Sequence, residues 1–215
     1  MKDEDFKTEQ EVFWSGQFGD DYIERNKSLQ LLGNKTAFYA RVLKSMNKFN
    51  SCLEFGSNIG LNLMALKNLL PDCECSAIEI NEKAVEMLNK NKKIKVYNQS
   101  ILDFEVDYQR ELVFTHGVLI HINPEKLKDV YKLLYEASNQ YILLTEYYNP
   151  APVEIEYRGN KGKLFKRDFA GEMLDGYKDL KLIDYGFVYH RDNQFPQDDF
   201  TWFLLQKNGG DEGVK

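Results

Sequence analysis

The chain has 215 residues, of which 43% are hydrophobic and 13% aromatic, so it is long and apolar enough to bury one sizeable core. Its net charge of −6 argues against a general nucleic-acid binder, because such binding depends on neutralised phosphates. No apolar run reaches the ~20 residues that span a bilayer, and the charged start lacks the apolar stretch of a secretion signal. We therefore expect a cytoplasmic protein with a small-molecule partner and with neither nucleic-acid nor membrane partners. The sequence leaves the oligomeric state open.

The three cysteines, Cys52, Cys73 and Cys75, are odd in number, and only one residue separates the last two. This pattern indicates neither a disulfide framework nor a four-ligand zinc site, so we expect reduced thiols and no metal. His116 and His121 do not form a metal pair, because a spacing of five fits neither one helix face nor one strand face.

Ahead of any core signal, residues 13–26 read FWSGQFGDDYIERN and combine large aromatic side chains with two glycines. A flexible arm has no use for such aromatics, and internal glycines weaken a surface helix. We expect residues 1–48 to form a helical cap whose aromatics are buried on the rest of the protein. The simpler alternative is that these aromatics only pack a helix onto a sheet.

From residue 49 to 207, short apolar runs alternate with amphipathic stretches, a pattern typical of a doubly wound, mostly parallel α/β sheet. The expected strands span 51–55, 75–80, 94–98, 111–117 and 140–148, and the expected helices span 61–70, 81–91 and 124–138. Two further strands, 180–190 and 199–207, have no helix between them and should pair antiparallel. We expect residues 208–215 to form a loose tail.

A glycine-punctuated turn follows the first strand, from Glu54 to Gly60. Gly56 allows the chain to turn and a ligand to approach the backbone, and Gly60 allows the next helix to start close to the strand. Glu79 ends the second strand 25 residues after Glu54, near the spacing at which an acidic residue meets ribose hydroxyls. Glycines at such a turn can also be purely structural.

The turn lacks the third glycine of a G-x-G-x-x-G motif, so the phosphate cradle of a dinucleotide site is missing. The segment NQSILD (98–103) suits an adenine edge, and LVFTHGVLIHI (112–122) follows as a fourth strand and its turn. This layout resembles the class I, Rossmann-like S-adenosylmethionine (SAM)-dependent methyltransferases over about residues 50–207. The resemblance implies a seven-stranded sheet of order 3-2-1-4-5-7-6 with the last strand antiparallel, SAM as cofactor and S-adenosylhomocysteine (SAH) as product.

Five blocks carry a closer resemblance: FWSGQFGDDYIERN, LEFGSNIGLNL, THGVLIHINP, TEYYNPAPVEIEYRG and GKLFKRDFAGEML. They are similar to methyltransferases associated with pseudaminic acid biosynthesis, which are found beside genes for bacterial nine-carbon sugars of flagella or cell surfaces. The resemblance implies methylation of a nonulosonic acid, of the pseudaminic or legionaminic type, or of its precursor. Two alternatives remain open: an N-methyltransferase of a non-sugar amino or guanidino metabolite, and a non-catalytic protein that binds SAM or SAH.

In class I methyltransferases the segment before the first strand covers one side of the cofactor cleft, so we interpret residues 13–26 as a lid. Trp14, Phe18 and Tyr22 would exclude water from the sulfonium, and Arg25 would meet the methionyl carboxylate. The predicted cofactor-binding residues are Trp14, Tyr22, Arg25, Glu54, Gly56, Asn58, Gly60, Glu79, Ile80, Ser100, Ile101, His116 and Gly117.

Two side chains are candidates for catalysis. His116 lies at the carboxyl end of the fourth strand, where open sheets place their ligands, although a histidine there can also orient a turn through hydrogen bonds. Glu146, at the end of the fifth strand, is placed to orient or deprotonate an acceptor. We expect a structural role for His121, which begins the following loop.

An insertion at about 146–168 is predicted to hold the acceptor. Its start is rich in tyrosine, and its end, RGNKGKLFKRD (158–168), is a basic run in an acidic chain that we interpret as an arm for an anionic substrate. A strand end with a turn and a solvated β-hairpin are the structural alternatives. The predicted substrate-binding residues are Phe18, Tyr147, Tyr148, Asn149, Tyr157, Arg158 and Lys163.

Overall fold

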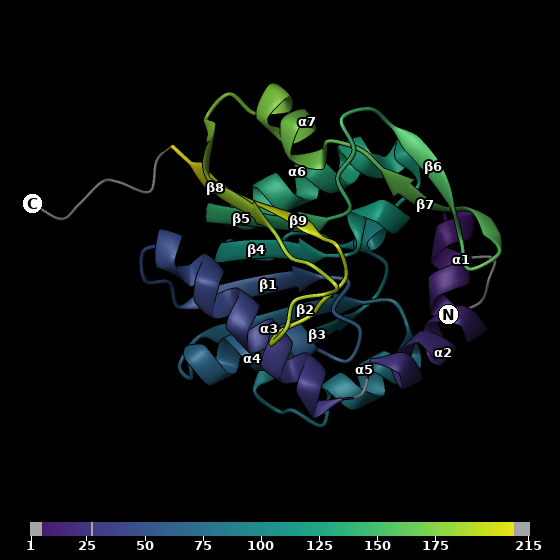
Figure 1. The fold of residues 1–215 in the computed structure, drawn as a ribbon, viewed down its shortest axis with the longest axis horizontal. Helices are drawn as coiled ribbons and strands as arrows, with labels where there is room; N and C mark the ends of the chain where they lie inside the picture. Colours follow the sequence, from purple (N-terminus) through teal and green to yellow (C-terminus); the bar gives the residue numbers. More distant parts are fainter. Residues whose placement is uncertain (1–5, 27, 209–215) are drawn as a thin grey trace, which may run out of the picture.

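The computed structural model describes residues 6–26 and 28–208, which fold around one central sheet of seven strands (Figure 1). The sheet has the order β3-β2-β1-β4-β5-β9-β8, and β9 runs antiparallel to both of its neighbours. Its strands are β1 (Ser51–Phe55), β2 (Glu74–Glu79), β3 (Ile94–Asn98), β4 (Arg110–His116), β5 (Ser138–Glu146), β8 (Leu180–Phe187) and β9 (Thr201–Lys207). The predicted fold class, strand order and antiparallel last strand are confirmed.

Most of the helices cover one face or the other of the sheet, and the first two lie over its carboxyl edge. The helices are α1 (Glu9–Ser15), α2 (Gln17–Arg25), α3 (Leu29–Val42), α4 (Leu61–Leu69), α5 (Glu82–Leu88), α6 (Leu127–Ala137) and α7 (Phe169–Gly176). One apolar core joins α3 and α4 to the sheet through residues such as Phe38, Leu66 and Trp202. The other joins α6 and α7 to the opposite face through residues such as Leu134 and Met173. No sequence pattern predicted α7, which is capped by the Asp168 side chain.

Short 3-10 turns complete the connections: η2 (Leu43–Ser45), η3 (Ile101–Asp103), η4 (Leu119–His121) and η5 (Pro124–Lys126). The parallel registers keep the strand ends level, since Phe55 of β1 pairs with Ile78 of β2 and with Thr115 of β4. The turns that follow these strands therefore meet at one edge of the sheet. The cavity of the candidate active site opens at this carboxyl edge of the sheet.

A separate hairpin, β6 (Val153–Tyr157) and β7 (Asn160–Lys166), stands beside α1 in Figure 1. Arg158 and Gly159 form its tight turn with φ of 49° and 81°. The Gln10 side chain donates to the Gly162 carbonyl at 2.9 Å, and the Lys163 ammonium lies 3.1 Å from Glu9 Oε1. The hairpin occupies part of the predicted 146–168 insertion and is clamped onto the N-terminal helix.

The predicted cap over residues 1–48 has two parts. Helix α3 is a layer of the core, because Phe38, Tyr39 and Val42 are buried against the sheet. Helices α1 and α2 lie over the carboxyl edge, as an expected lid would (Figure 1). Within the described residues, no helix is both long and apolar enough to cross a membrane. The tail expected at 208–215 lies, except for Asn208, outside the described residues.

Candidate active site

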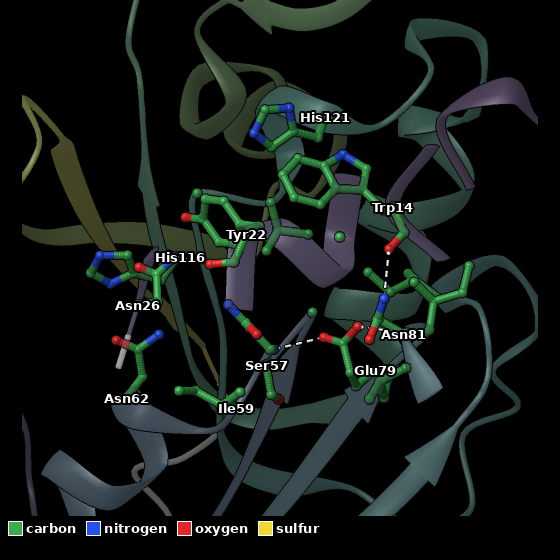
Figure 2. A pocket seen from close by; sticks show the side chains of 18 of the residues that line it. Trp14, Tyr22, Asn26, Ser57, Ile59, Asn62, Glu79, Asn81, His116 and His121 are labelled. Carbon is green, nitrogen blue, oxygen red and sulfur yellow. Dashed lines mark hydrogen bonds between the residues drawn. The ribbon is translucent and has the colours of Figure 1, made fainter. Parts of the chain in front are cut away.

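A cavity of about 430 Å³ opens at the carboxyl edge of the sheet, a size typical of small-molecule sites. The turns after β1, β2, β3 and β4 form its floor, α1 and α2 form its roof, and residues 196–200 close one side. Figure 2 shows His116 on one side of it and Trp14 with His121 on another. Most of the predicted cofactor residues line it: Trp14, Tyr22, Gly56, Asn58, Glu79, Ile80, Ser100, Ile101, His116 and Gly117.

The glycine turn after β1 is shaped by close approaches. Gly56, Asn58 and Gly60 have φ of 70°, 49° and 80°. A Cβ on Gly56 would lie 2.8 Å from Val118 Cγ2, and one on Gly60 would lie 2.5 Å from Leu88 Cδ2. Gly56 therefore allows the turn after β4 to approach the cavity floor, whereas Gly60 lets α5 pack and does not line the cavity.

Glu79 is held in place at the end of β2. Its Oε2 accepts the Asn58 backbone N–H at 2.6 Å, and its Oε1 accepts the Asn81 N–H at 2.8 Å. Burial raises the pKa of Glu79, although these backbone donors act in the opposite direction. Because each carboxylate oxygen keeps a further lone pair, the group can still accept hydrogen bonds from a ligand in the cavity.

The predicted lid, now defined as helices α1 and α2, is attached to the strand ends beside Glu79. The Asn81 amide donates to Asp20 Oδ1 at 2.9 Å and to the Trp14 carbonyl at 3.4 Å, the latter drawn as a dashed line in Figure 2. Asp20 also pairs with Lys83 at 2.5 Å. At the end of β3, Ser100 donates a short hydrogen bond to Glu11 of α1. Helices α1 and α2 are thus tied to the ends of two strands.

A buried carboxylate, that of Glu54, lies under the floor of the cavity, and its charge interacts with that of Lys35. Glu54 is fully buried and accepts from the Asn62 amide at 2.6 Å through Oε1, while its Oε2 has no partner among the described residues. Burial raises the pKa of Glu54 and lowers the pKa of Lys35, and the opposite charges of the two groups moderate both effects. Lys35 lines the cavity, whereas Glu54 does not.

Arg25 lies away from the position predicted for it. Its guanidinium carbon is 5.2 Å from the Phe18 ring centroid and 5.4 Å from that of Tyr22, so it packs on aromatic faces of the lid. Neither Arg25 nor Phe18 lines the cavity. Among the described lining residues, Lys35 is the only lysine or arginine.

His116 lines the cavity inside an aromatic cage. Its ring centroid lies 5.0 Å from Phe200 and 5.6 Å from Phe38, both edge-on. Neither ring nitrogen has a hydrogen-bond partner among the described residues. Burial, together with the positive charge of Lys35, lowers the pKa of His116 well below its usual range, so the ring is neutral at pH 7.

Glu146, the second catalytic candidate, does not line the cavity. Its carboxylate accepts the backbone N–H groups of Val118, Leu119 and Ile120 at 3.1 to 3.3 Å. Burial raises the pKa of Glu146 to about 7, against the effect of these donors. The structure therefore places Glu146 beneath η4, where its carboxylate holds the turn and is not part of the cavity wall.

The predicted acceptor residues stand outside the cavity lining. Tyr147 stacks on Phe200 at 4.7 Å, Tyr148 packs near Phe203, and the Asn149 amide donates to the Ala151 carbonyl. In the basic run, Lys163 pairs with Glu9 and Arg167 pairs with Glu172, while Arg158 and Lys166 lie over tyrosine rings. These basic side chains therefore have partners within the hairpin, α1 or α7, and the anion-binding arm stays a prediction.

Several lining residues were not predicted from the sequence. Ser57, Ile59, Asn62 and Asn81 adjoin the glycine turn and Glu79, so their positions in the sequence could have indicated them. Asn26 ends the 13–26 block but was not singled out, and others come from segments without a recognisable motif: Gln10, Glu11, Lys35, His190, Gln197, Asp198 and Phe200. His121 also lines the cavity, although we expected it to be structural.

The three cysteines meet at the opposite edge of the sheet, where Cys52 of β1 pairs in register with Cys75 of β2. All three are buried and free, and their sulfur atoms lie within 4.8 Å of one another. Cys52 Sγ and Cys75 Sγ are 3.5 Å apart. The sequence pattern did not predict this convergence.

No family model matches the chain, and no curated protein matches its sequence. The magnesium protoporphyrin IX methyltransferase ChlM from Synechocystis PCC 6803, with bound SAH, matches with a TM-score of 0.67 and 11% identity over 92% of this chain and 97% of its own. The Burkholderia thailandensis 1,6-didemethyltoxoflavin-N1-methyltransferase, with 1,6-didemethyltoxoflavin and SAH, matches with a TM-score of 0.66 and 9% identity. The match covers 92% of this chain and 86% of its own. The plantazolicin methyltransferase BpumL, with a pentazolic desmethylPZN analog and SAH, matches with a TM-score of 0.61 and 14% identity. The match covers 93% of this chain and 94% of its own.

These similarities establish the class of fold. The chain has the Rossmann-like α/β fold of solved SAM-dependent methyltransferases over nearly its whole length. At 9 to 14% identity, the likeness concerns the fold alone.

Proposed function

We propose that the protein is a SAM-dependent methyltransferase that acts on a small-molecule acceptor. The observation that carries the proposal is the carboxylate of Glu79, held by two backbone N–H groups at the rim of the cavity and next to the glycine turn. A carboxylate at the end of the second strand suits the paired hydroxyls of a ribose. The solved proteins named above, which share this fold, contain SAH.

The lining residues fit such a cofactor. Ile80, Ser100 and Ile101 would hold the adenine, Glu79 the ribose, and Lys35 the methionyl carboxylate. The Trp14 indole N–H and both His116 nitrogens are buried without partners among the described residues, as polar groups that await a ligand would be. The cofactor supplies an electrophilic methyl group, and the protein aligns an acceptor with it and excludes water.

For the acceptor, we propose a nonulosonic acid sugar or its precursor, on the strength of the sequence blocks that resemble the pseudaminic acid methyltransferases. An amino or guanidino acceptor is the second candidate. The cavity lining favours it because three carboxylates, those of Glu11, Glu79 and Asp198, outnumber the single cation of Lys35 among the described residues.

Cofactor binding can be tested by calorimetry with SAH. We expect Glu79→Ala to weaken SAH binding by about 30-fold or more, because hydrogen bonds to a charged acceptor contribute about 1.5 to 3 kcal/mol each. Glu74→Ala, an exposed position on the same strand, is the matched control and should bind like the native protein. Unchanged affinity in Glu79→Ala, or tight binding of NADH by the native protein, would contradict the proposal.

Turnover distinguishes an enzyme from a non-catalytic binder. The native protein is incubated with SAM and each of four probes: N-acetylneuraminic acid, its cytidine-monophosphate form, putrescine as a non-sugar amine, and arginine. Mass spectrometry then detects a methylated product. Methylation of either acidic sugar supports the nonulosonic acceptor, and methylation of only the amine or guanidine supports the second candidate. SAM binding without methylation of any of these probes or of related acceptors supports the alternative of a non-catalytic protein that binds SAM or SAH.

A further inference from the structure

His121 comes from η4, the turn that follows β4, and its imidazole is fixed from behind. Its Nδ1 lies 2.6 Å from the backbone carbonyl oxygen of Lys163 in β7. A carbonyl oxygen offers only lone pairs, so Nδ1 must carry the hydrogen of this bond. In the neutral ring, Nε2 is then the proton-free nitrogen.

The surroundings keep this ring neutral. His121 is only 8% exposed and contacts the rings of Trp14 at 4.5 Å and Tyr157 at 4.9 Å. Burial lowers the pKa of His121 to about 4, although the bond to the Lys163 carbonyl acts in the opposite direction. In the hairpin behind the ring, the ammonium of Lys163 pairs with Glu9 Oε1 at 3.1 Å.

Three separate parts of the fold position the ring. The carboxylate of Glu146 fixes the backbone of η4, the hairpin carbonyl fixes Nδ1, and the lid supplies the Trp14 face. The result is a neutral imidazole at the cavity wall with one nitrogen already occupied (Figure 2). His116, in contrast, has no partner among the described residues that would select either tautomer.

We propose that His121 is the general base of the methyl transfer and takes the acceptor's proton on Nε2. This inference rests on the proposed methyltransferase function. The acceptor heteroatom bonds to the methyl carbon, the bonding pair of the C–S bond stays on sulfur, and the acceptor's proton passes to Nε2 and then to water. The acceptor class is thereby narrowed to groups that carry a proton at neutral pH, namely a hydroxyl, an ammonium or a guanidinium, rather than a carboxylate. A cationic nitrogen gives its proton to Nε2 before its lone pair attacks the methyl carbon.

The tautomer can be measured without any acceptor. The chain has three histidines, so long-range ¹H–¹⁵N NMR of the SAH complex, compared among H116N, H121N and H190N, assigns every imidazole signal. We expect protonated Nδ1 and bare Nε2 for His121 from pH 8 down to about pH 5. A protonated Nε2 at pH 7 would overturn the proposal.

The catalytic role is tested with whichever of the four probes the native protein methylates. In H121N the amide can still donate to the Lys163 carbonyl, but it offers no base. We expect kcat to fall by about 100-fold or more while the acceptor KM stays within twofold, and free imidazole to restore part of kcat in H121G. A purely structural histidine would show no such rescue.

The comparison variant is H116N, because the sequence favoured His116 as the base. Full turnover in H121N together with a large loss in H116N would overturn the proposal in favour of His116. If the native protein fails to bind SAH, the methyltransferase function fails instead, which calorimetry detects without reference to His121.

Discussion

Lys35 and Arg25 carry the same charge but lie in different places relative to the cavity. Both are candidates for the methionyl carboxylate by charge, but only Lys35 lines the cavity, while the Arg25 guanidinium packs on Phe18 and Tyr22. Burial lowers the pKa of Lys35, so its ammonium lacks full compensation until an anion enters. An incoming carboxylate would supply that compensation.

We expect Lys35→Met to weaken SAH binding by at least tenfold, since a charge-assisted hydrogen bond in a partly buried site is lost. Arg25→Met serves as the matched control and should change the affinity by less than threefold. Isothermal titration calorimetry at constant ionic strength measures both. The reverse ranking of the two variants would restore Arg25 as the carboxylate partner.

The glycines offer a test of stability at single positions. Gly60 has φ of 80°, and an added Cβ would meet Leu88 Cδ2 at 2.5 Å, so we expect Gly60→Ala to lower the free energy of unfolding by about 1 to 3 kcal/mol. At Gly33, within α3, an added Cβ would meet no atom of a neighbouring element within 4 Å, so Gly33→Ala should stabilise by about 0.5 to 1 kcal/mol. Urea denaturation compares the two; equal effects would contradict the geometry.

At the scale of elements, the hairpin and the lid depend on each other. Within the run 158–168, where an arm for an anionic substrate stays a prediction, β7 supplies a carbonyl to His121 and a lysine to Glu9 of α1. Helices α1 and α2 in turn hold Asn81 and Ser100 at the strand ends. The insertion therefore acts on the cavity through its backbone and through the lid.

Removing the lid should separate folding from binding. We expect deletion of residues 1–26, which leaves the Ser28 cap of α3 intact, to preserve one cooperative unfolding transition in circular dichroism. SAH affinity should fall by more than tenfold, because Glu11, Trp14 and Tyr22 are lost from the cavity wall. Gln17→Ala is the control, because among the described residues the Gln17 amide bonds to Asp21 within α2. A truncated protein with native affinity would show that α1 and α2 are only packing.

For the whole molecule, the regular parts could be read from the sequence, since β1 and β3 begin and end at the predicted residues. Local pattern also placed Gly56, Glu79 and His116 at the cavity, because each directly follows or ends a strand. It could not place Lys35, Asp198 or the hairpin carbonyl of Lys163, which reach the site only through tertiary packing. His121 was read as structural for the same reason: its partner lies 42 residues away.

The contacts between α1 and β7 would also affect the timing of the proposed catalytic cycle. We expect a molecule as large as a nucleoside to enter more readily when α1 and α2 lift, a movement that would part Glu9 from Lys163 and Gln10 from Gly162. The same movement withdraws Trp14 from His121 and frees the hairpin that orients the imidazole. The state that orients His121 for the reaction and the state that lets ligands pass would then exclude each other. We expect release of SAH, rather than the methyl transfer itself, to limit the rate of turnover.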